Sequence, residues 1–124
     1  MNNDFPKVKI ERVHLIENEY QDHHGDIYSA LKLIEQSKKY KVFELPLIGV
    51  QLSRNAWNIE TLSDFIHHVD RMKYTDLNNP IILDVEGVIC DGLHRLCKAI
   101  IEGKTTIKAI RLEEMPFKDR HEKE

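Results

Sequence analysis

A run of five residues in the last third of the chain combines side chains that suit phosphate binding. The run reads Asp91-Gly92-Leu93-His94-Arg95. The guanidinium of Arg95 can hold phosphate oxygens at two points, and His94 can donate to phosphate or move a proton near neutral pH. The carboxylate of Asp91 can hold a hydrated Mg²⁺ ion or accept the proton of a hydroxyl group. These residue types favour a ligand with phosphate groups, most simply a nucleotide.

The run lies where a predicted strand passes directly into a predicted helix. Residues 81–90 have the pattern of a β-hairpin, in which Gly87 supplies the positive φ of the turn. A helix is expected directly after Gly92, with Leu96, Cys97, Ile100 and Ile101 as its apolar positions, and Gly103 is typical of a helix C-terminus. The first turn of such a helix has free N–H groups that attract anions, and Gly92 has no side chain to block close approach.

A purely structural interpretation of the same run stays open at this stage. In it Asp91 caps the helix, Gly92 makes the turn, and His94 and Arg95 project into solvent. Helix caps are common, whereas anion sites are rarer. Spacing alone does not decide between the two interpretations.

Three segments are expected to surround the run. The apolar residues 43–52 predict a buried strand, in which Pro46 indicates an edge position or a bulge. A stripe at helical spacing predicts a helix that begins at Asn58 or Thr61. The β-branched residues 105–112 predict a last strand. The stripe consists of Leu62, Phe65, Ile66, Val69 and Met72.

The ends of the chain carry weaker signals. Val8, Ile10, Val13 and Leu15 indicate a weak strand or an extended arm. The polar stretch 18–25 is typical of a loop, after which Asp26 is expected to cap a helix that continues to about Lys39. We therefore expect an N-terminal extension over 1–42, a main domain over 43–116 and a solvated, charged tail over 117–124.

Composition indicates a folded domain, and the order of the predicted strands and helices indicates an α/β (α+β) fold, for which we expect a small mixed sheet with flanking helices. The 124 residues are 41% hydrophobic and 31% charged, which is enough apolar content for a core. The longest apolar runs are too short for a membrane span, and no apolar stretch follows a basic N-terminus, so we expect a cytoplasmic protein with no membrane partner. The net charge of −3 and the lack of a basic segment disfavour nucleic acid as the main partner.

The stretch from Pro80 to Leu112 resembles the ParB/sulfiredoxin superfamily. It has the family's order of hairpin, Gly-x-x-Arg turn, helix, Gly and apolar strand. The turn reads Gly-Glu-Arg-Arg in the ParB N-terminal domain, Gly-Cys-His-Arg in sulfiredoxin and Asp-Gly-His-His-Arg in kinases of free serine. The run Asp91 to Arg95 is most similar to the kinase form, and segments 47–52 and 61–72 look like the family's first core strand and the helix before the hairpin.

The resemblance implies a nucleotide site. Gly92, Leu93, His94 and Arg95 would hold the phosphates of ATP, ADP or CTP, with Mg²⁺, and the most concrete activity would be phosphoryl transfer to a small hydroxyl compound. His94 or Asp91 would then handle the proton, and Asp91 is also the expected metal ligand.

Some positions depart from the family pattern or are ambiguous. Leu93 occupies the position of sulfiredoxin's nucleophilic cysteine, so reduction of a sulfinic acid is not expected. The kinases also use a catalytic glutamate, for which Glu44 and Glu60 are guesses. Arg54 follows the first core strand and either adds a cation to the phosphate site or is an ordinary surface arginine.

Two alternatives to a nucleotide-binding phosphotransferase stay open. One is a non-catalytic or nuclease-like DNA-associated regulatory module, and the other is a degenerate pocket that serves as a scaffold for homo-oligomers. Among the remaining residues, Trp57 either stacks on a base or packs on the helix start. Cys90 and Cys97 are interpreted as buried small side chains. The adjacent pairs His23-His24 and His67-His68 lack the i, i+4 spacing that directs two ligands to one metal.

Overall fold

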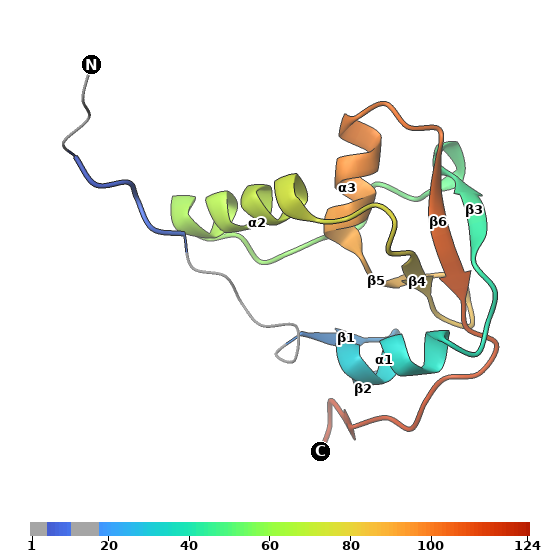
Figure 1. Ribbon diagram of the computed structural model, residues 1–124. Coiled ribbons are helices and arrows are strands. Elements are labelled where there is room, and N and C mark those ends of the chain that lie inside the picture. Colours follow the sequence, from blue (N-terminus) through green and yellow to red (C-terminus); the bar gives the residue numbers. More distant parts are fainter. Residues whose placement is uncertain (1–4, 11–17) are drawn as a thin grey trace.

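Seven short strands and three α-helices form the computed structural model, which describes residues 5–10 and 18–124 (Figure 1). The strands are β1 (Glu19–Gln21), β2 (Asp26–Ser29), β3 (Phe43–Pro46), β4 (Ile81–Leu83), β5 (Ile89–Asp91), β6 (Thr106–Arg111) and β7 (Arg120–His121). The helices are α1 (Ala30–Ser37), α2 (Leu62–Tyr74) and α3 (Leu93–Ile101), and the 3₁₀ turn η2 spans Leu47–Gly49. The expected mixed α+β class is therefore confirmed.

The larger sheet has the strand order β3-β6-β4-β5 and is mixed, because β6 pairs parallel to β4 while the other neighbours are antiparallel. Successive side chains of β4 point to opposite faces of this sheet. Ile81 and Leu83 join the core under α3, and Ile82 joins the core under α1. Burial on both faces explains why β4 is apolar at every position. The hairpin β4–β5 and the strand β6 agree with the sequence-based predictions.

The smaller sheet, in the order β1-β2-β7, corrects two predictions for the N-terminal region. Residues 18–25 are not all loop, since β1 lies within them and pairs with β2. Asp26 begins β2 and caps no helix. The cap of α1 is Ser29, whose side chain accepts a hydrogen bond from the N–H of Lys32. The short, polar β1 lacks the apolar alternation that would have revealed it.

The C-terminal segment 117–124 is mostly exposed, as expected of a tail, but it also contains β7. Strand β7 pairs with β2, so residues 26–29 and the C-terminal segment share one sheet. Arg120 holds the carboxylate of Glu19 through two hydrogen bonds of 2.6 and 2.8 Å. Asp119 accepts a bond from the backbone of Ser29 and pairs with Lys32. Local sequence patterns could not predict these ion pairs, because the partners lie about 90–100 residues apart in the chain.

The buried strand predicted over 43–52 is shorter than expected and mostly exposed rather than buried. Strand β3 ends at Pro46, and the chain turns through η2 before residue 50. Proline cannot donate to a sheet ladder, and β3 is an edge strand, as Pro46 had indicated. Val8 and Ile10 are not in a strand, and Val13 and Leu15 lie outside the described residues.

Helix α2 begins after Thr61, one of the two predicted starts. Thr61 and Asp64 form a reciprocal capping box, which satisfies N–H groups of the first turn. At the other end Lys98 of α3 donates to the carbonyl of Thr75 at 2.7 Å. The apolar stripe predicted for this helix exists but is largely exposed, with Leu62 at 74% and Phe65 at 53%. Within the part of the chain that the structure describes, no helix is long and apolar enough to cross a membrane.

A buried carboxylate connects the two sheets. Asp84 is 3% exposed and lies in the turn of the β4–β5 hairpin. Its Oδ1 accepts hydrogen bonds from the backbone N–H groups of Glu86 and Val88, both at 2.9 Å, and these bonds close the turn. Its Oδ2 accepts a bond of 2.9 Å from the hydroxyl of Tyr20 in β1. Burial and this contact raise the pKa of Tyr20, so its hydroxyl stays protonated and donates.

Replacement of Tyr20 by Phe tests this connection. We expect Tyr20→Phe to lower the free energy of unfolding by about 1–3 kcal/mol, because a buried carboxylate oxygen loses its donor. Urea denaturation measures the change. The matched control is Tyr40→Phe, which loses only a long contact of 3.4 Å to Gln36 and is expected to change stability little. Equal stability of the two variants would contradict the prediction.

Candidate functional site

A cavity of about 530 Å³ lies at the N-terminus of α3. The predicted site residues all line it: Arg54, Asp91, Gly92, Leu93, His94 and Arg95. Helix α2 and the loop before it add Trp57, His67, His68 and Arg71, and β1 closes another side. The volume is typical of cavities that hold small molecules. The structure therefore brings the predicted residues together in one place.

The first turn of α3 faces this cavity without a side-chain cap. Gly92 is the N-cap residue, with φ of +107°, and no side chain accepts from the N–H groups of the first turn. The structural interpretation of Asp91 as the cap is therefore wrong. Those N–H groups have no partner within the helix, and the helix dipole gives them partial positive charge. This end of α3 is suited to an anion.

Arg95 and Asp91 hold each other. Nη2 of Arg95 lies 2.9 Å from Oδ2 of Asp91, and the two side chains are only 17% and 16% exposed. The same nitrogen also donates to the carbonyl of Pro80 at 3.3 Å. Nε of Arg95 is buried and has no hydrogen-bond partner. The arginine therefore lines the cavity with its guanidinium already engaged by Asp91 at the end of β5 and by Pro80 before β4.

The ion pair between Arg95 and Asp91 also affects whether the cavity can bind Mg²⁺. Mg²⁺ is usually held by one or two carboxylates together with phosphate oxygens and water. Asp91 is already neutralised by Arg95, and Glu19, the other carboxylate of the cavity lining, is held by Arg120. The lining does not offer the donor set of a magnesium site, and Asp91 is not placed as a metal ligand.

Gly92 is glycine because of packing as well as backbone geometry. A Cβ atom at this position would lie 2.6 Å from Cγ2 of Ile81 and 2.8 Å from Nη2 of Arg95. The expectation that the missing side chain leaves room for a ligand is therefore wrong, since Ile81 and Arg95 fill that space. The contribution of Gly92 to the cavity is through its backbone.

His94 forms a hydrogen-bonded pair with His68 of α2. Nε2 of His94 lies 2.8 Å from Nδ1 of His68, and the ring planes differ by 12°. The ring centroids are 5.1 Å apart, so the rings lie edge to edge in almost one plane. Trp57 stacks on both rings, with centroid distances of 4.3 Å to each. Trp57 thus packs over a histidine pair at the α2–α3 contact.

Both histidines of the pair favour the neutral form. Burial lowers the pKa of His94 to about 3, with further lowering by Arg71, His68, His67 and Arg95. Burial, His67 and Arg71 also lower the pKa of His68. One of the two facing nitrogens must accept, so the pair cannot take up two extra protons while this hydrogen bond persists. His94 is therefore a weak base at neutral pH.

Two arginines of the cavity have no carboxylate partner among the described residues. Arg54 donates to the carbonyl of Ile89 at 3.1 Å, and its charge remains uncompensated by an ion pair. Arg71 lowers the pKa of both His68 and His94, which shows that its charge acts on the cavity. Arg54 is exposed and also lines the cavity, so both interpretations of this residue agree with the structure.

Sequence reasoning missed His68 and Arg71. Their signal was present, because residues three and four apart share a helix face, and His67, His68 and Arg71 have that spacing on α2. Their relation to α3 depends on the packing of two helices and had no local signal. Glu44 and Glu60, the guesses for a catalytic glutamate, do not belong to the described lining of this cavity.

The two cysteines are less buried than predicted. Cys90 and Cys97 are free thiols of intermediate exposure. Burial raises the pKa of both, so the reactive thiolate is disfavoured. Sγ of Cys90 lies 3.4 Å from the carbonyl oxygen of Ile82.

Comparison of the chain with protein-family models, with curated proteins and with solved structures finds no match. The resemblance to the ParB/sulfiredoxin superfamily therefore stays a prediction.

The packing around Gly92 can be separated from its backbone conformation by a matched pair of variants. Gly92 and Gly103 both have positive φ, at +107° and +77°, but nothing lies within 4 Å of a Cβ at position 103. We expect Gly103→Ala to cost about 1–2 kcal/mol from conformation alone. Gly92→Ala must also displace Ile81 and Arg95 and should cost clearly more in urea denaturation. Equal losses would show that the packing at Gly92 is not tight.

The low pKa of His94 predicts a pH-dependent stability. The unfolded chain binds a proton at His94 below about pH 6.5, whereas the folded chain resists it down to about pH 3. The contribution of His94 to the free energy of unfolding is fully present above about pH 6.5 and decreases as the pH falls toward 3. We expect His94→Gln to have a shallower loss of stability than the unmodified chain between pH 7 and 5.

His23→Gln, which changes a histidine outside this cavity, is the control for that titration. Denaturation curves in EDTA at pH 7, 6 and 5 give the slopes. A His94→Gln slope that matches the unmodified chain would show that this histidine is not held neutral by the fold.

Proposed function

We propose that the cavity at the N-terminus of α3 binds a ligand with phosphate groups, of the nucleotide class. The observation that carries this proposal is the placement of two uncompensated arginines, Arg54 and Arg71, in one cavity with the uncapped first turn of α3. Backbone N–H groups at a helix N-terminus and guanidinium groups are the two donors that proteins most often combine around phosphate.

The charge balance of the lining favours an anion. The lining includes three arginines and two carboxylates, and both carboxylates are already paired, Asp91 with Arg95 and Glu19 with Arg120. A ligand with two or more negative oxygens would neutralise the charges of Arg54 and Arg71. It would also favour protonation of the neighbouring histidine pair, because a nearby negative charge stabilises the imidazolium form.

The proposal differs from the family-based expectation in the role of Arg95. Arg95 is engaged with Asp91 at the start of α3, so it has a supporting role at the phosphate site, and Arg71 is the residue that would contact the phosphate. The agreement lies in the order of hairpin, Gly92, helix, Gly103 and strand. The resemblance to the superfamily supports ATP, ADP and CTP as the first ligands to test.

Binding is better supported than phosphoryl transfer. A catalytic base for a hydroxyl acceptor needs a pKa near the working pH. His94 has a pKa of about 3 and its Nε2 is engaged with His68, while Asp91 is neutralised by Arg95. Transfer to a small hydroxyl compound, a DNA-associated regulatory role and homo-oligomers stay predictions from the sequence.

Arg71→Ala is the sharpest test, because Arg71 has no ion pair among the described residues and its loss disturbs no contact of that kind. Isothermal titration with inorganic phosphate, ADP, ATP and CTP should detect one site per chain. We expect Arg71→Ala to weaken binding about 10- to 100-fold, since it removes a charge-assisted hydrogen bond.

Lys104→Ala is the control, because it removes one exposed positive charge outside the cavity. It should leave the affinity within about twofold, as expected for a distant, screened charge. Equal weakening by both variants would indicate a general charge effect. No heat with any of the four ligands would contradict the proposal, and a salt-sensitive gel shift with duplex DNA would favour the DNA-associated role instead.

A further inference from the structure

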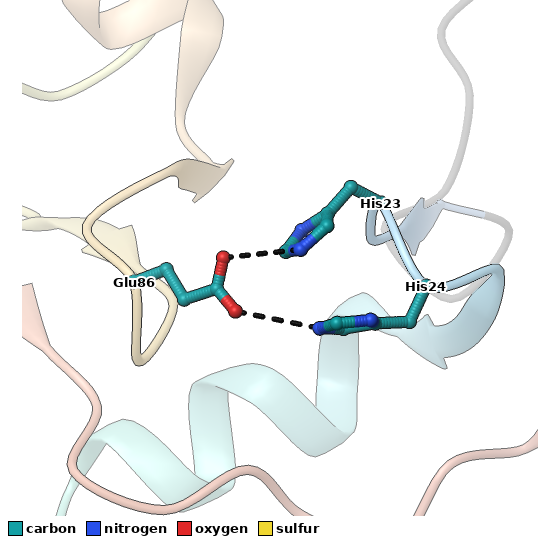
Figure 2. A group of neighbouring side chains, drawn as sticks. All are labelled: His23, His24 and Glu86. Carbon is teal, nitrogen blue, oxygen red and sulfur yellow. Dashed lines mark hydrogen bonds and ion pairs between the residues drawn. The ribbon is translucent and has the colours of Figure 1, made fainter.

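Two turns from different sheets bring two histidines and a glutamate together on the surface. Figure 2 shows His23 and His24, from the turn between β1 and β2, with their rings directed at the carboxylate of Glu86 in the β4–β5 turn. Nε2 of His23 lies 3.3 Å from Oε2 of Glu86, and Nε2 of His24 lies 3.4 Å from Oε1. The ligand atoms of the three side chains all lie within 4.8 Å of one another.

The spacing of these atoms suits a metal better than a pair of hydrogen bonds. A hydrogen bond between a charged imidazole and a carboxylate is about 2.7–2.9 Å long, and both contacts exceed this. In a tetrahedral zinc site with bonds of about 2.0–2.2 Å, neighbouring ligand atoms lie roughly 3.3–3.6 Å apart. Each histidine lies at a distance in that range from one of the two carboxylate oxygens of Glu86.

Each of the two turns is held by its own aspartate, Asp22 in one and Asp84 in the other. Asp22 accepts hydrogen bonds from the N–H groups of His24 and Asp26, at 2.9 and 3.0 Å. The carbonyl of His24 also lies 2.9 Å from Nε2 of His121 in β7. The turn that carries Glu86 is closed by the buried carboxylate of Asp84. The backbone of the cluster is therefore ordered before any ion binds, which lowers the entropic cost of binding.

The chemistry of the donor set identifies the class of ion. Two imidazoles and one carboxylate are typical ligands of Zn²⁺, which is also found with three protein ligands and one water. Hard ions such as Mg²⁺ prefer oxygen ligands. The side chains are 56%, 63% and 47% exposed, so solvent can reach the remaining coordination position.

We propose that His23, His24 and Glu86 bind one Zn²⁺ ion, which links the turn of the smaller sheet to the turn of the larger sheet. The sequence-based interpretation set His23 and His24 aside because adjacent histidines lack a spacing that supports a metal. Glu86 supplies the missing third ligand from 62 residues away. In the part of the chain that the structure describes, this is the one group of three or more such side chains with ligand atoms so close together.

The ion would lie at the rim of a second cavity, of about 590 Å³. This cavity is lined in part by His23, Leu45, Val50, Leu83 and Val88. Its walls are largely apolar. His23 belongs to one of the two turns and Val88 follows the other, so an ion that links the turns would also fix the shape of the cavity entrance.

A titration with Zn²⁺ on the full chain tests the proposal. After removal of metals with EDTA and exchange into chelator-free buffer, we expect calorimetry to show one Zn²⁺ site per chain and no site for Mg²⁺. Saturating Zn²⁺ should raise Tm by several degrees, because the ion binds the folded state. Glu86→Gln and His23→Ala should each weaken zinc binding by at least about tenfold and remove the rise in Tm.

Two controls separate this cluster from other zinc-binding groups. Glu102→Gln removes an exposed carboxylate at the end of α3 and should leave zinc binding unchanged. His67→Gln alters the other adjacent histidine pair, in the anion cavity, and should also leave it unchanged. Zinc binding that survives Glu86→Gln and His23→Ala, or that is lost in His67→Gln, would overturn the assignment. Circular dichroism of each variant verifies folding.

Discussion

The buried carboxylate of Asp84 is the interaction on which the arrangement of this protein depends. A carboxylate this deeply buried is costly unless its oxygens are fully hydrogen-bonded. Here one oxygen closes the β4–β5 turn and the other accepts from Tyr20 in the smaller sheet. If the smaller sheet moved away, Asp84 would lose a donor inside the core. The electrostatic cost of that loss keeps two short sheets in a fixed relation.

The functional features lie at the two ends of the hairpin that Asp84 organises. At the turn end, Glu86 meets His23 and His24 because Tyr20 holds β1 nearby. At the other end, β5 leads through Gly92 into α3, whose first turn faces the cavity of about 530 Å³. Tyr20, Gln21, Arg54 and Ile89 line both cavities, so one wall is shared between them. A substitution at either end of the hairpin therefore affects the same two short strands, β4 and β5.

The features that the sequence predicted well depend on local physics. The β4–β5 hairpin, α3 with Gly103 after it, and β6 follow from turn chemistry, helix capping and side-chain periodicity. The features that it missed depend on distant partners. Strand β7 exists because of its pairing with β2, and the polar β1 is too short to show alternation. Local patterns contain no information about such pairings.

The same distinction explains why the sequence predicted which residues line the cavity but not which partners their side chains contact. The run 91–95 located the cavity, because a strand followed by a helix exposes N–H groups wherever it occurs. The direction of each side chain was decided by competition for partners. Arg95, in the first turn of α3, lies next to Asp91 at the end of β5, so the two side chains form an ion pair without a ligand. Among residues 5–10 and 18–124, Arg71 has no such carboxylate neighbour in an ion pair, which is why the proposed ligand is assigned to it.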